Sequence, residues 1–307
     1  MELKYELLKN DFIKHGWRTL YRIKALKDFG DVKTGDLGGY IEKEYNLNHE
    51  SNCWVYDNAK VYGDAQVYYN ARIFGNAEIY GKAKIFGNAK IFGNVEVFDD
   101  AHVYDNAHVY GNAKISIGAW VFGNAEVFDD AWISGGAWIC DGAYISGDAY
   151  ISGNAYIYGN AKVFDNAKIS DNAKVSDNAR VSGNVRVSKN AEVFGNAKIS
   201  GDALIFGNAK VFDNAKVFGD ASIFKENIIG TVSVPFKDIF QYKCKKRTLT
   251  AILTENNEIL YSIGCQNNIT EEEFIKRIYE DEGLKKNPHR KEYLKLIPAI
   301  NIYFKGE

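Results

Sequence analysis

Several features that would assign a class of function are missing from this chain of 307 residues. Lys and Arg number 38 against 40 Asp and Glu, for a formal net charge of −2, so the composition has no bias toward nucleic acid. The N-terminal stretch MELKYELLKNDFIKHGW scatters charges among its apolar residues, and no later run is long and apolar enough to span a membrane. We therefore expect a cytoplasmic protein with no secretory signal, no membrane contact and no nucleic acid partner.

Cysteine and the common catalytic motifs are also scarce. The four cysteines are far apart and form no CxxC pair, which argues against a disulfide framework and against a zinc ribbon. The sequence has no P-loop, no GxGxxG on a βαβ unit, no HExxH and no cluster of metal ligands. We expect no metal site and no bound cofactor, and we expect free thiols at Cys53, Cys140, Cys244 and Cys265.

What the sequence does contain is one six-residue phrase, repeated. Every sixth residue from Val55 to Ile223 is Val or Ile, at 29 positions without an insertion or deletion. Two residues before each stands a small residue, usually Ala, so the phrase is A-x-[IV]-[FYS]-[GD]-[ND]. Turn exceptions are Tyr69-Asn70, Ile117-Gly118 and Lys225-Glu226. This uniform period predicts a repeat architecture.

Within each phrase, alternation places the small and branched residues on one face and their neighbours on the other, which is typical of a short strand. The following Gly or Asp with Asn or Asp tolerates a positive φ and predicts a sharp corner. Ordering six residues costs about 6–12 kcal/mol, whereas burying one Val or Ile contributes about 1.5–3 kcal/mol. A single coil is therefore unstable, and the coils must stack.

The repeat resembles the hexapeptide-repeat family over residues 53–229. That resemblance implies an all-β fold, a left-handed parallel β-helix with triangular coils, hence about ten coils of eighteen residues. The handedness comes from the resemblance alone, because the general rule for parallel crossovers suggests the opposite hand.

Both flanks of the repeat break its period. Residues 1–52 read as an N-terminal cap, with a strand at WRTLYRIKAL (17–26) and tight turns in DFGDVKTGDLGGYIEKE (28–44). This segment, continuing into NCWVYDNA, is similar to the N-terminal part of uncharacterised acetyltransferase-like hexapeptide proteins of bacteria and phages. The similarity brings no catalytic residue with it.

Residues 230–307 predict a small α+β unit. A hairpin is expected at 248–265, turning at Asn256-Asn257. Thr270 and Glu273 form a capping box that opens a helix. That helix should end before Gly283 and place four apolar residues on one face: Phe274, Ile275, Ile278 and Tyr279. A second helix should begin at Asn287-Pro288 and end at Pro298. Its apolar residues are Tyr293, Leu294, Leu296 and Ile297. We interpret the unit as a cap that also contacts a protein partner; an independent binding module is the alternative.

Outward positions eighteen residues apart should form vertical columns. Aromatic residues fill two of them, Tyr56, Phe74, Phe92, Tyr110 and Phe128 in one, Tyr68, Phe86, Tyr104 and Phe122 in the other. Stacked rings would stabilise the coils by about 0.5–1.5 kcal/mol per pair. The alternative is that these stripes are subunit interfaces.

In the middle of the repeat the aromatic residues move to the position before the aliphatic one. This aromatic belt, interrupted by Glu126, precedes a basic belt that is diluted by aspartates at the corners. The two belts either continue the ladder beside a solvated charged face, or form an oligomer interface, or bind a nucleotide, a sugar phosphate or single-stranded nucleic acid. Their residues are Trp120, Trp132, Trp138, Tyr144, Tyr150 and Tyr156, then Lys162, Lys168, Lys174, Arg180 and Arg186.

The resemblance also implies an activity, because many hexapeptide-repeat proteins are trimeric acyltransferases that bind acyl-CoA between subunits and use a His as general base. His102 and His108 are the histidines of the repeat, and Glu126 stands one coil beyond His108, where it could orient that ring. The family's acceptor site usually needs a loop thrown out of a coil, and no hexad here is interrupted. We interpret His15, His49 and His289 as ordinary polar residues, and we do not favour a nucleophile pair of Cys265 with His289.

Three hypotheses follow from the sequence. The preferred one is a non-catalytic β-solenoid scaffold or binding protein that self-associates, with a trimer favoured, through its outward aromatic columns. The second is an acyltransferase-like trimer that uses acyl-CoA with His102 or His108 as the base. The third is a protein that sequesters an anionic small molecule at the two belts.

Overall fold

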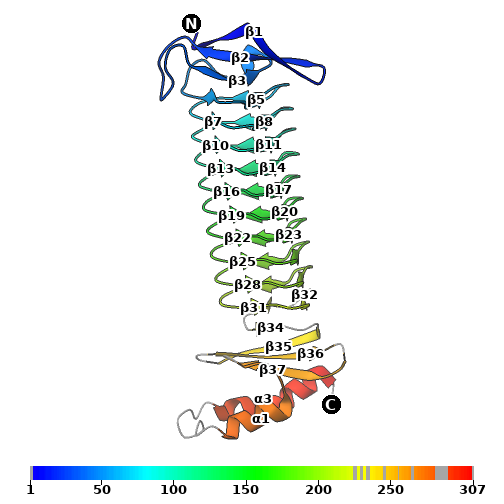
Figure 1. Cartoon of the computed structure of the whole chain (residues 1–307). Helices are drawn as coiled ribbons and strands as arrows, with labels where there is room; N and C mark the ends of the chain where they lie inside the picture. Colours follow the sequence, from blue (N-terminus) through cyan, green and yellow to red (C-terminus); the bar gives the residue numbers. More distant parts are fainter. Residues whose placement is uncertain are drawn as a thin grey trace. The chain divides into compact units, whose positions relative to one another are not determined.

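The computed structural model describes residues 3–223, 227–228, 231–232, 236–244, 247–254, 256–263, 266–280 and 290–305. Figure 1 labels its strands and helices along the chain. The backbone divides into two compact units, Met1–Asp177 and Asn178–Glu307. Within the described residues, no helix combines the length and the apolar character needed to cross a membrane.

The first unit begins with a small antiparallel sheet. Strand β1 (Tyr5–His15) pairs with β2 (Arg18–Ala25), which pairs with β3 (Leu37–Ile41). The short 3-10 helix η1 (Glu44–Asn46) follows. The strand expected at 17–26 is thus confirmed as β2, whereas β1 was not predicted. Because β3 also runs parallel to the first strand of one face of the repeat, the cap covers an open sheet edge there.

The repeat region of the first unit contains 21 strands of two residues each, and each strand begins six residues after the one before. They are β4 (Trp54–Val55), β5 (Lys60–Val61), β6 (Gln66–Val67), β7 (Arg72–Ile73), β8 (Glu78–Ile79), β9 (Lys84–Ile85), β10 (Lys90–Ile91), β11 (Glu96–Val97), β12 (His102–Val103), β13 (His108–Val109), β14 (Lys114–Ile115), β15 (Trp120–Val121), β16 (Glu126–Val127), β17 (Trp132–Ile133), β18 (Trp138–Ile139), β19 (Tyr144–Ile145), β20 (Tyr150–Ile151), β21 (Tyr156–Ile157), β22 (Lys162–Val163), β23 (Lys168–Ile169) and β24 (Lys174–Val175).

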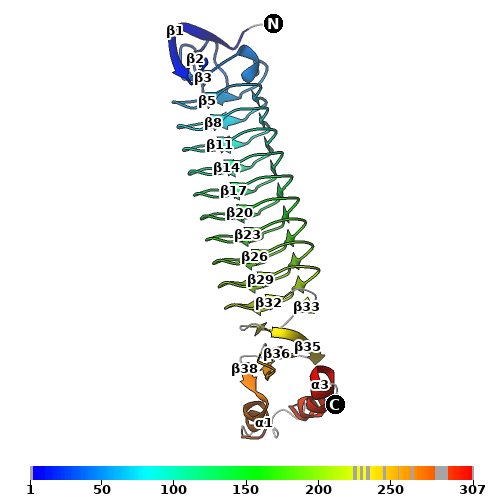
Figure 2. The same ribbon diagram turned by 90° about the vertical axis from the view of Figure 1, so that its right-hand side faces the viewer.

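Within this unit, each strand from β4 to β21 pairs in parallel with the strand three places later. Lys90 of β10, for example, is in register with His108 of β13 and with Arg72 of β7. The strands therefore form three parallel sheets, which we call the β4 face (β4, β7 and onward to β22), the β5 face (β5, β8 and onward to β23) and the β6 face (β6, β9 and onward to β24). The three-sided coil of eighteen residues is confirmed, and Figure 2 shows its rungs in succession.

The interior of each coil is built from the small and branched residues of the phrase. Ala77, Ile79, Ala83 and Ile85 are all 0% exposed, and the same holds along the rest of the first unit with rare exceptions of 1%. Backbone bonds join successive coils, as from Lys90 N to Ala107 O at 2.9 Å. Since one coil buries only a few apolar side chains, these ladders of backbone bonds supply the rest of its stabilisation.

The corners use a left-handed backbone conformation. Of the 28 corner positions from Asp57 to Gly219 with positive φ, all are Gly or Asp except Tyr69, Ile117 and Lys189. A Cβ on Gly81 would lie 2.6 Å from the backbone nitrogen of Asp99 in the next coil, so that position requires glycine.

Aspartates at these corners bind the coil that follows. The Asp57 carboxylate accepts a hydrogen bond from Gly75 N at 2.9 Å, and Asp129 accepts one from Gly147 N at 3.2 Å. No two corner aspartates with positive φ are eighteen residues apart, so aspartate never follows aspartate in one column.

Asparagines at the next corner position form amide ladders along the coils. Asn70, Asn88, Asn106 and Asn124 are joined in series by bonds of 3.0, 3.1 and 3.2 Å. Each amide donates from Nδ2 to the Oδ1 of the following coil, so both ends of an interior amide are satisfied.

The second unit contains eight more strands of the repeat. Arg180 is in register with Lys198, and Arg186 with Leu204, in the same eighteen-residue pairing. Strands β33 (Asn227–Ile228) and β34 (Thr231–Val232) extend two of the sheets beyond the regular period. The eight repeat strands are β25 (Arg180–Val181), β26 (Arg186–Val187), β27 (Glu192–Val193), β28 (Lys198–Ile199), β29 (Leu204–Ile205), β30 (Lys210–Val211), β31 (Lys216–Val217) and β32 (Ser222–Ile223).

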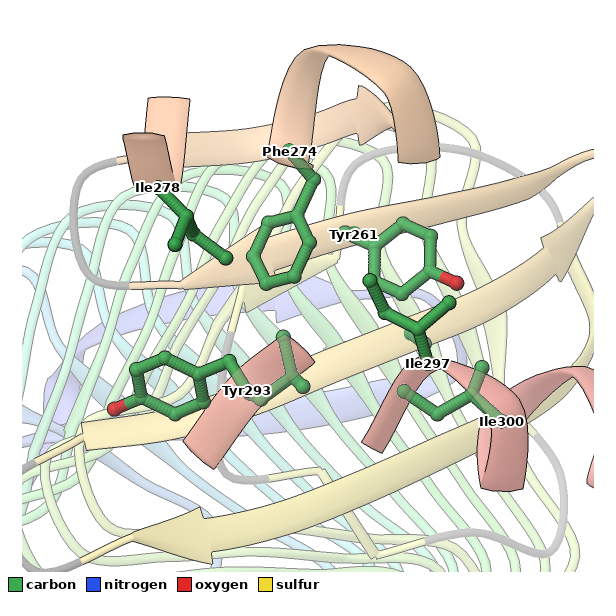
Figure 3. Packing of buried hydrophobic residues seen from close by; sticks show 8 residues of the cluster. Tyr261, Phe274, Ile278, Tyr293, Ile297 and Ile300 are labelled. Carbon is green, nitrogen blue, oxygen red and sulfur yellow. The ribbon is translucent and has the colours of Figure 1, made fainter. Parts of the chain in front are cut away.

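The second unit also holds a four-stranded antiparallel sheet of β35 (Phe236–Cys244), β36 (Arg247–Thr254), β37 (Ile259–Ile263) and β38 (Gln266–Thr270). The hairpin expected at 248–265 is confirmed by the pairing of β36 with β37. Two helices, α1 (Glu271–Glu280) and α3 (Arg290–Lys305), pack on the sheet. Figure 3 shows Tyr261 of the sheet meeting Phe274 and Ile278 of α1 and Tyr293, Ile297 and Ile300 of α3.

Two expectations about these helices are wrong. Helix α3 does not end at Pro298 but continues to Lys305, because Ile297 and Ile300 on either side of the proline are buried in this core and their burial outweighs one lost backbone bond. Tyr279 is 60% exposed rather than part of the buried face of α1. The Thr270 cap is confirmed by its bond from Glu273 N at 3.3 Å, while Gly283 and Asn287-Pro288 lie outside the described residues.

Candidate functional site

His102 stands in the outward position of β12 on the β6 face. Its strand lies between Lys84 and Trp120 in register, and its ring stacks on the Trp120 indole with centroids 4.6 Å apart. Burial lowers the pKa of His102 and outweighs the effect of the nearby Asp100 backbone, so the imidazole is neutral at pH 7. A neutral ring can accept a proton, which is the requirement for a general base.

His108 and Glu126 lie in register on adjacent strands of the β4 face, as expected from their eighteen-residue separation. The carboxylate also faces the Tyr110 hydroxyl, and burial together with the charge of Glu126 raises the pKa of that tyrosine. His102 lies on the β6 face, whereas His108 lies on the β4 face, so the two histidines belong to different sheets. The two histidines therefore do not belong to one site.

The aromatic belt covers a row of small buried residues. The Trp132 indole donates to the Ser116 hydroxyl at 3.2 Å, and the Ser134 hydroxyl bonds the Tyr150 hydroxyl at 3.3 Å. Ser116 is 0% and Ser134 is 3% exposed. In each pair the ring lies sixteen residues after the small residue, on the next coil of the same face. The rings therefore act as covers for the preceding coil.

Cys140 follows the same pattern. Its thiol lies 3.6 Å from the Tyr156 hydroxyl and is 2% exposed. Burial raises the pKa of the Cys140 thiol, and the hydrogen bond to Cys140 raises the pKa of Tyr156 to about 12. The thiol is therefore protonated at pH 7 and has the character of a structural residue. Cys53 is likewise buried and unpaired, and Cys265 and His289 lie outside the described residues.

The six aromatic residues of the belt do not converge on one site. Trp120, Trp138 and Tyr156 are on the β6 face, Trp132 and Tyr150 on the β5 face, and Tyr144 on the β4 face. Trp120 stacks on Trp138 at 5.5 Å, and Trp132 meets Tyr150 edge to face at 5.5 Å. Trp132 and Trp138 keep 42% and 45% of their surface exposed.

The basic belt is distributed in the same way. In the first unit Lys162, Lys168 and Lys174 are exposed and lie on three different faces. The Lys162 amine lies 5.1 Å from the centre of the Tyr144 ring. In the second unit Arg180 and Arg186 are exposed on different sheets. Within each unit, the basic residues therefore do not form one concentrated anion site.

The outward columns of aromatic rings stack closely in the first unit. Phe92, Tyr110 and Phe128 follow one another at 4.8 and 4.6 Å with nearly parallel rings. The column from Tyr68 through Phe86 and Tyr104 to Phe122 has spacings of 5.0, 4.6 and 4.9 Å. A third column, beyond the two expected from the sequence, contains Tyr62, Tyr80 and Phe98 at 5.1 and 5.0 Å.

A pocket near the N-terminal cap was also not anticipated from the sequence. Its volume is about 880 Å³, and its lining includes Tyr45, His49, Tyr68 and Tyr69. His49, which the sequence alone presents as an ordinary polar residue, lies in this lining. The available signal was Tyr69, an aromatic residue in a corner position that is otherwise almost always Gly or Asp. No group of three or more potential metal ligands occurs within the described part of the chain.

Comparisons with known proteins agree with the repeat. A family model described as YdcK beta solenoid repeat matches residues 173–189. The uncharacterized acetyltransferase YdcK of Escherichia coli (strain K12) is 50% identical over 38 residues. The chain is a β-solenoid of six-residue repeats, and a short part of it is similar to a protein described as an uncharacterized acetyltransferase. The family resemblance of the sequence is thereby confirmed, although the match spans 12% of this solenoid protein and 12% of its relative.

Proposed function

We propose that this hexapeptide-repeat solenoid is a non-catalytic scaffold that self-associates through exposed aromatic and aliphatic side chains on its outer faces. The observation that carries the proposal is the exposure of three large apolar side chains, Ile117, Trp132 and Trp138, which are 60%, 42% and 45% exposed. They lie on two neighbouring faces and at a corner, and we refer to them together as the exposed patch. Monomeric proteins rarely expose large apolar residues together. A second copy of the chain would remove this surface from water.

The three residues belong to neighbouring coils. Ser116, whose hydroxyl binds the Trp132 indole, immediately precedes Ile117, and a Cβ on the next residue, Gly118, would lie 3.9 Å from the Gly135 carbonyl. Trp138 follows Gly135 by three positions. Ile117 is a β-branched residue at φ 50°, a conformation that strains such a side chain. Strain of this kind persists where it serves a contact or a site.

The uninterrupted coils support a scaffold rather than an enzyme. Strands β4 to β32 follow one another every six residues, and no loop longer than a corner leaves the repeat between Trp54 and Ile223. A catalytic site needs several groups that converge on one reacting atom. His102 and His108 lie on separate faces, and the aromatic and basic belts are spread around the coil. We expect a trimer, as the family resemblance implies.

The test is the oligomeric mass of the full chain. Native mass spectrometry of the wild type should give a trimer, and the double variant Trp132→Ser with Trp138→Ser should give a monomer that still unfolds cooperatively. Lys168→Ser, at the equivalent outward position of the β5 face, is the matched control and should keep the wild-type mass. A monomeric wild type, or a double variant of unchanged mass, would refute self-association through this patch.

Acyl transfer is the second candidate function, and two observations favour it. A relative of the chain carries the description of an uncharacterized acetyltransferase, and the ring of His102 is neutral at pH 7. The scaffold proposal expects no transfer from acetyl-CoA to a panel of amine and hydroxyl acceptors. If acyl transfer were observed and were lost in His102→Ala or in His108→Ala with thermal unfolding unchanged, the protein would be an enzyme and the scaffold proposal would be refuted.

A further inference from the structure

The pocket at the N-terminal cap has a distinctive chemical lining. It lies where η1 and the segment after it meet the first strand of the β6 face, and its volume is about 880 Å³. Two carboxylates, Glu44 and Glu50, and three tyrosines, Tyr45, Tyr68 and Tyr69, contribute to the wall. Among the lining residues that the structure describes, none is lysine or arginine. The lining therefore favours a positively charged ligand.

Two lysines beside the pocket already have partners, and the Lys43 amine also lies 5.0 Å from the centre of the Tyr45 ring. The Lys4 amine donates to the Ser51 carbonyl at 2.8 Å and to the Cys53 carbonyl at 2.9 Å. The Lys43 amine donates to the Tyr45 hydroxyl at 2.6 Å and to Asp64 at 3.3 Å. Because these ammonium groups already have partners, the acidic wall of the pocket is left for another cation.

The tyrosines provide ring faces of the kind that attract cations. Tyr68 and Tyr69 lie 5.3 Å apart between ring centres, with an angle of 53° between their planes, so they form an aromatic corner. The Tyr45 hydroxyl donates to Asp64 at 2.7 Å, which holds the ring in place while 49% of the residue stays exposed. The negative face of such a ring attracts an ammonium group.

The backbone of Tyr69 is strained in a way that points to a role for its side chain. Its φ is 57°, in the left-handed region where a bulky residue is disfavoured, and its side chain is 60% exposed. Gly or Asp occupies 25 of the 28 equivalent corners. A glycine here would remove the strain, so the tyrosine is retained at a cost in stability.

His49 adds a hydrogen-bond donor without a partner. Its Nδ1 accepts the Lys4 backbone N–H at 3.1 Å, and its ring stacks on Tyr5 at 4.2 Å. Burial lowers the pKa of His49, so the neutral ring carries its proton on Nε2. That Nε2 is buried and has no hydrogen-bond partner among the described residues. Because Nε2 is closed to solvent in this structure, an acceptor oxygen on a ligand in the pocket satisfies it only with a small shift of the ring.

We infer that the pocket binds a small organic cation that carries an ammonium group and a nearby hydroxyl. The ammonium group would lie against Tyr68 and Tyr69, balanced by Glu44 and Glu50, and the hydroxyl oxygen would accept from His49. This site is independent of the exposed patch of Ile117, Trp132 and Trp138, so binding and self-association can be tested separately.

Isothermal titration calorimetry of the full chain with choline and ethanolamine tests the inference. At least one of them should bind saturably with one site per chain, and the neutral isostere of choline, with carbon in place of nitrogen, should bind at least about tenfold more weakly. Tyr69→Gly and Glu50→Gln should each weaken binding at least about fivefold. Raising the salt concentration should weaken binding of the cation but not of the isostere.

A second corner with positive φ, at Lys189, supplies the matched control for Tyr69→Gly. Tyr69→Gly should raise the melting temperature in the absence of ligand while it weakens binding, a combination that a merely structural tyrosine would not give. Lys189→Gly relieves the same kind of corner far along the sequence and should leave binding unchanged. Absence of saturable binding by both ammonium probes, equal binding of the neutral isostere, or unchanged binding in Tyr69→Gly would overturn the inference.

Discussion

The Trp132 indole donates a hydrogen bond to the Ser116 hydroxyl across sixteen residues of sequence, at 3.2 Å. The same offset joins Tyr62 to Glu78 and Cys140 to Tyr156. In each case the residue before the aliphatic position of one coil contacts the residue after it in the preceding coil. A large side chain before the aliphatic residue therefore covers a small one after the aliphatic residue of the preceding coil. This explains why the aromatic belt is accompanied by serines.

This diagonal contact predicts that Trp132→Ala destabilises the protein. The substitution uncovers Ser116 and removes the covered part of a half-exposed indole, so we expect the free energy of unfolding to fall by about 1–2 kcal/mol. Chemical denaturation of the wild type and the variant measures the difference. Lys168→Ala, an exposed residue of the same face, should change stability by less than about 0.5 kcal/mol. Equal effects of the two substitutions would contradict a covering role for the indole.

The corners predict opposite effects for two substitutions in the second unit. Lys189 has φ 60°, so Lys189→Gly should raise the free energy of unfolding by about 0.5–1 kcal/mol, the left-handed penalty less the extra entropy of glycine. Gly195→Ala should lower it, because the added Cβ would lie 2.8 Å from the Asp213 backbone nitrogen. Urea denaturation compares both with the wild type, and a stabilising alanine would show that the corner is not under steric constraint.

His102 predicts a pH dependence of stability. Its pKa is lowered in the folded state by burial, so the folded protein binds a proton less readily than the unfolded chain. The stabilisation is therefore complete above about pH 6.5, the pKa of an unperturbed histidine, and is lost as the pH falls below it. His102→Phe keeps a ring on Trp120 and should show a smaller drop in melting temperature between neutral and acidic pH. His49, whose pKa is also lowered, should preserve part of the drop.

The amide ladder gives a further prediction. Asn88 accepts from Asn70 and donates to Asn106, so Asn88→Asp would replace a donor by a carboxylate oxygen that faces the Asn106 oxygen. We expect a loss of about 0.5–1.5 kcal/mol in the free energy of unfolding. Asn58→Asp is the control, since its side chain makes no ladder bond in the described structure. A loss of similar size in both variants would attribute the effect to charge alone.

The coiled architecture was predictable because its information is local and repeated. Ala77 and Ile79 occupy the same positions of the phrase as Ala83 and Ile85, so the period is evident even with an isolated exception such as Tyr69. The helix at Pro298 shows the limit of local rules, because the burial of Ile297 and Ile300 depends on a sheet that is distant in the sequence. Strand β1 escaped prediction for the same reason: its partner β2 determines it.

The candidate sites were less accessible to sequence reasoning. Stacking of His102 on Trp120 follows directly from the eighteen-residue coil. The pocket, in contrast, joins His49 of the cap to Tyr69 of a corner, and no periodic pattern relates these residues. Likewise, a serine such as Ser116 gives no sign in the sequence that a ring from the next coil will bury it.

The corner aspartates restrict how a protein of this kind can be lengthened. Each corner aspartate, such as Asp57 or Asp129, is followed by a non-acidic residue one coil later, often by a glycine whose N–H it binds. Inserting a second copy of any single coil that carries such an aspartate would set two carboxylates directly over each other, about 4.8 Å apart. Duplication in pairs of coils restores the alternation of acidic and neutral corners. The smallest insertion that avoids this repulsion is therefore a pair of coils, which is much longer than the six-residue phrase.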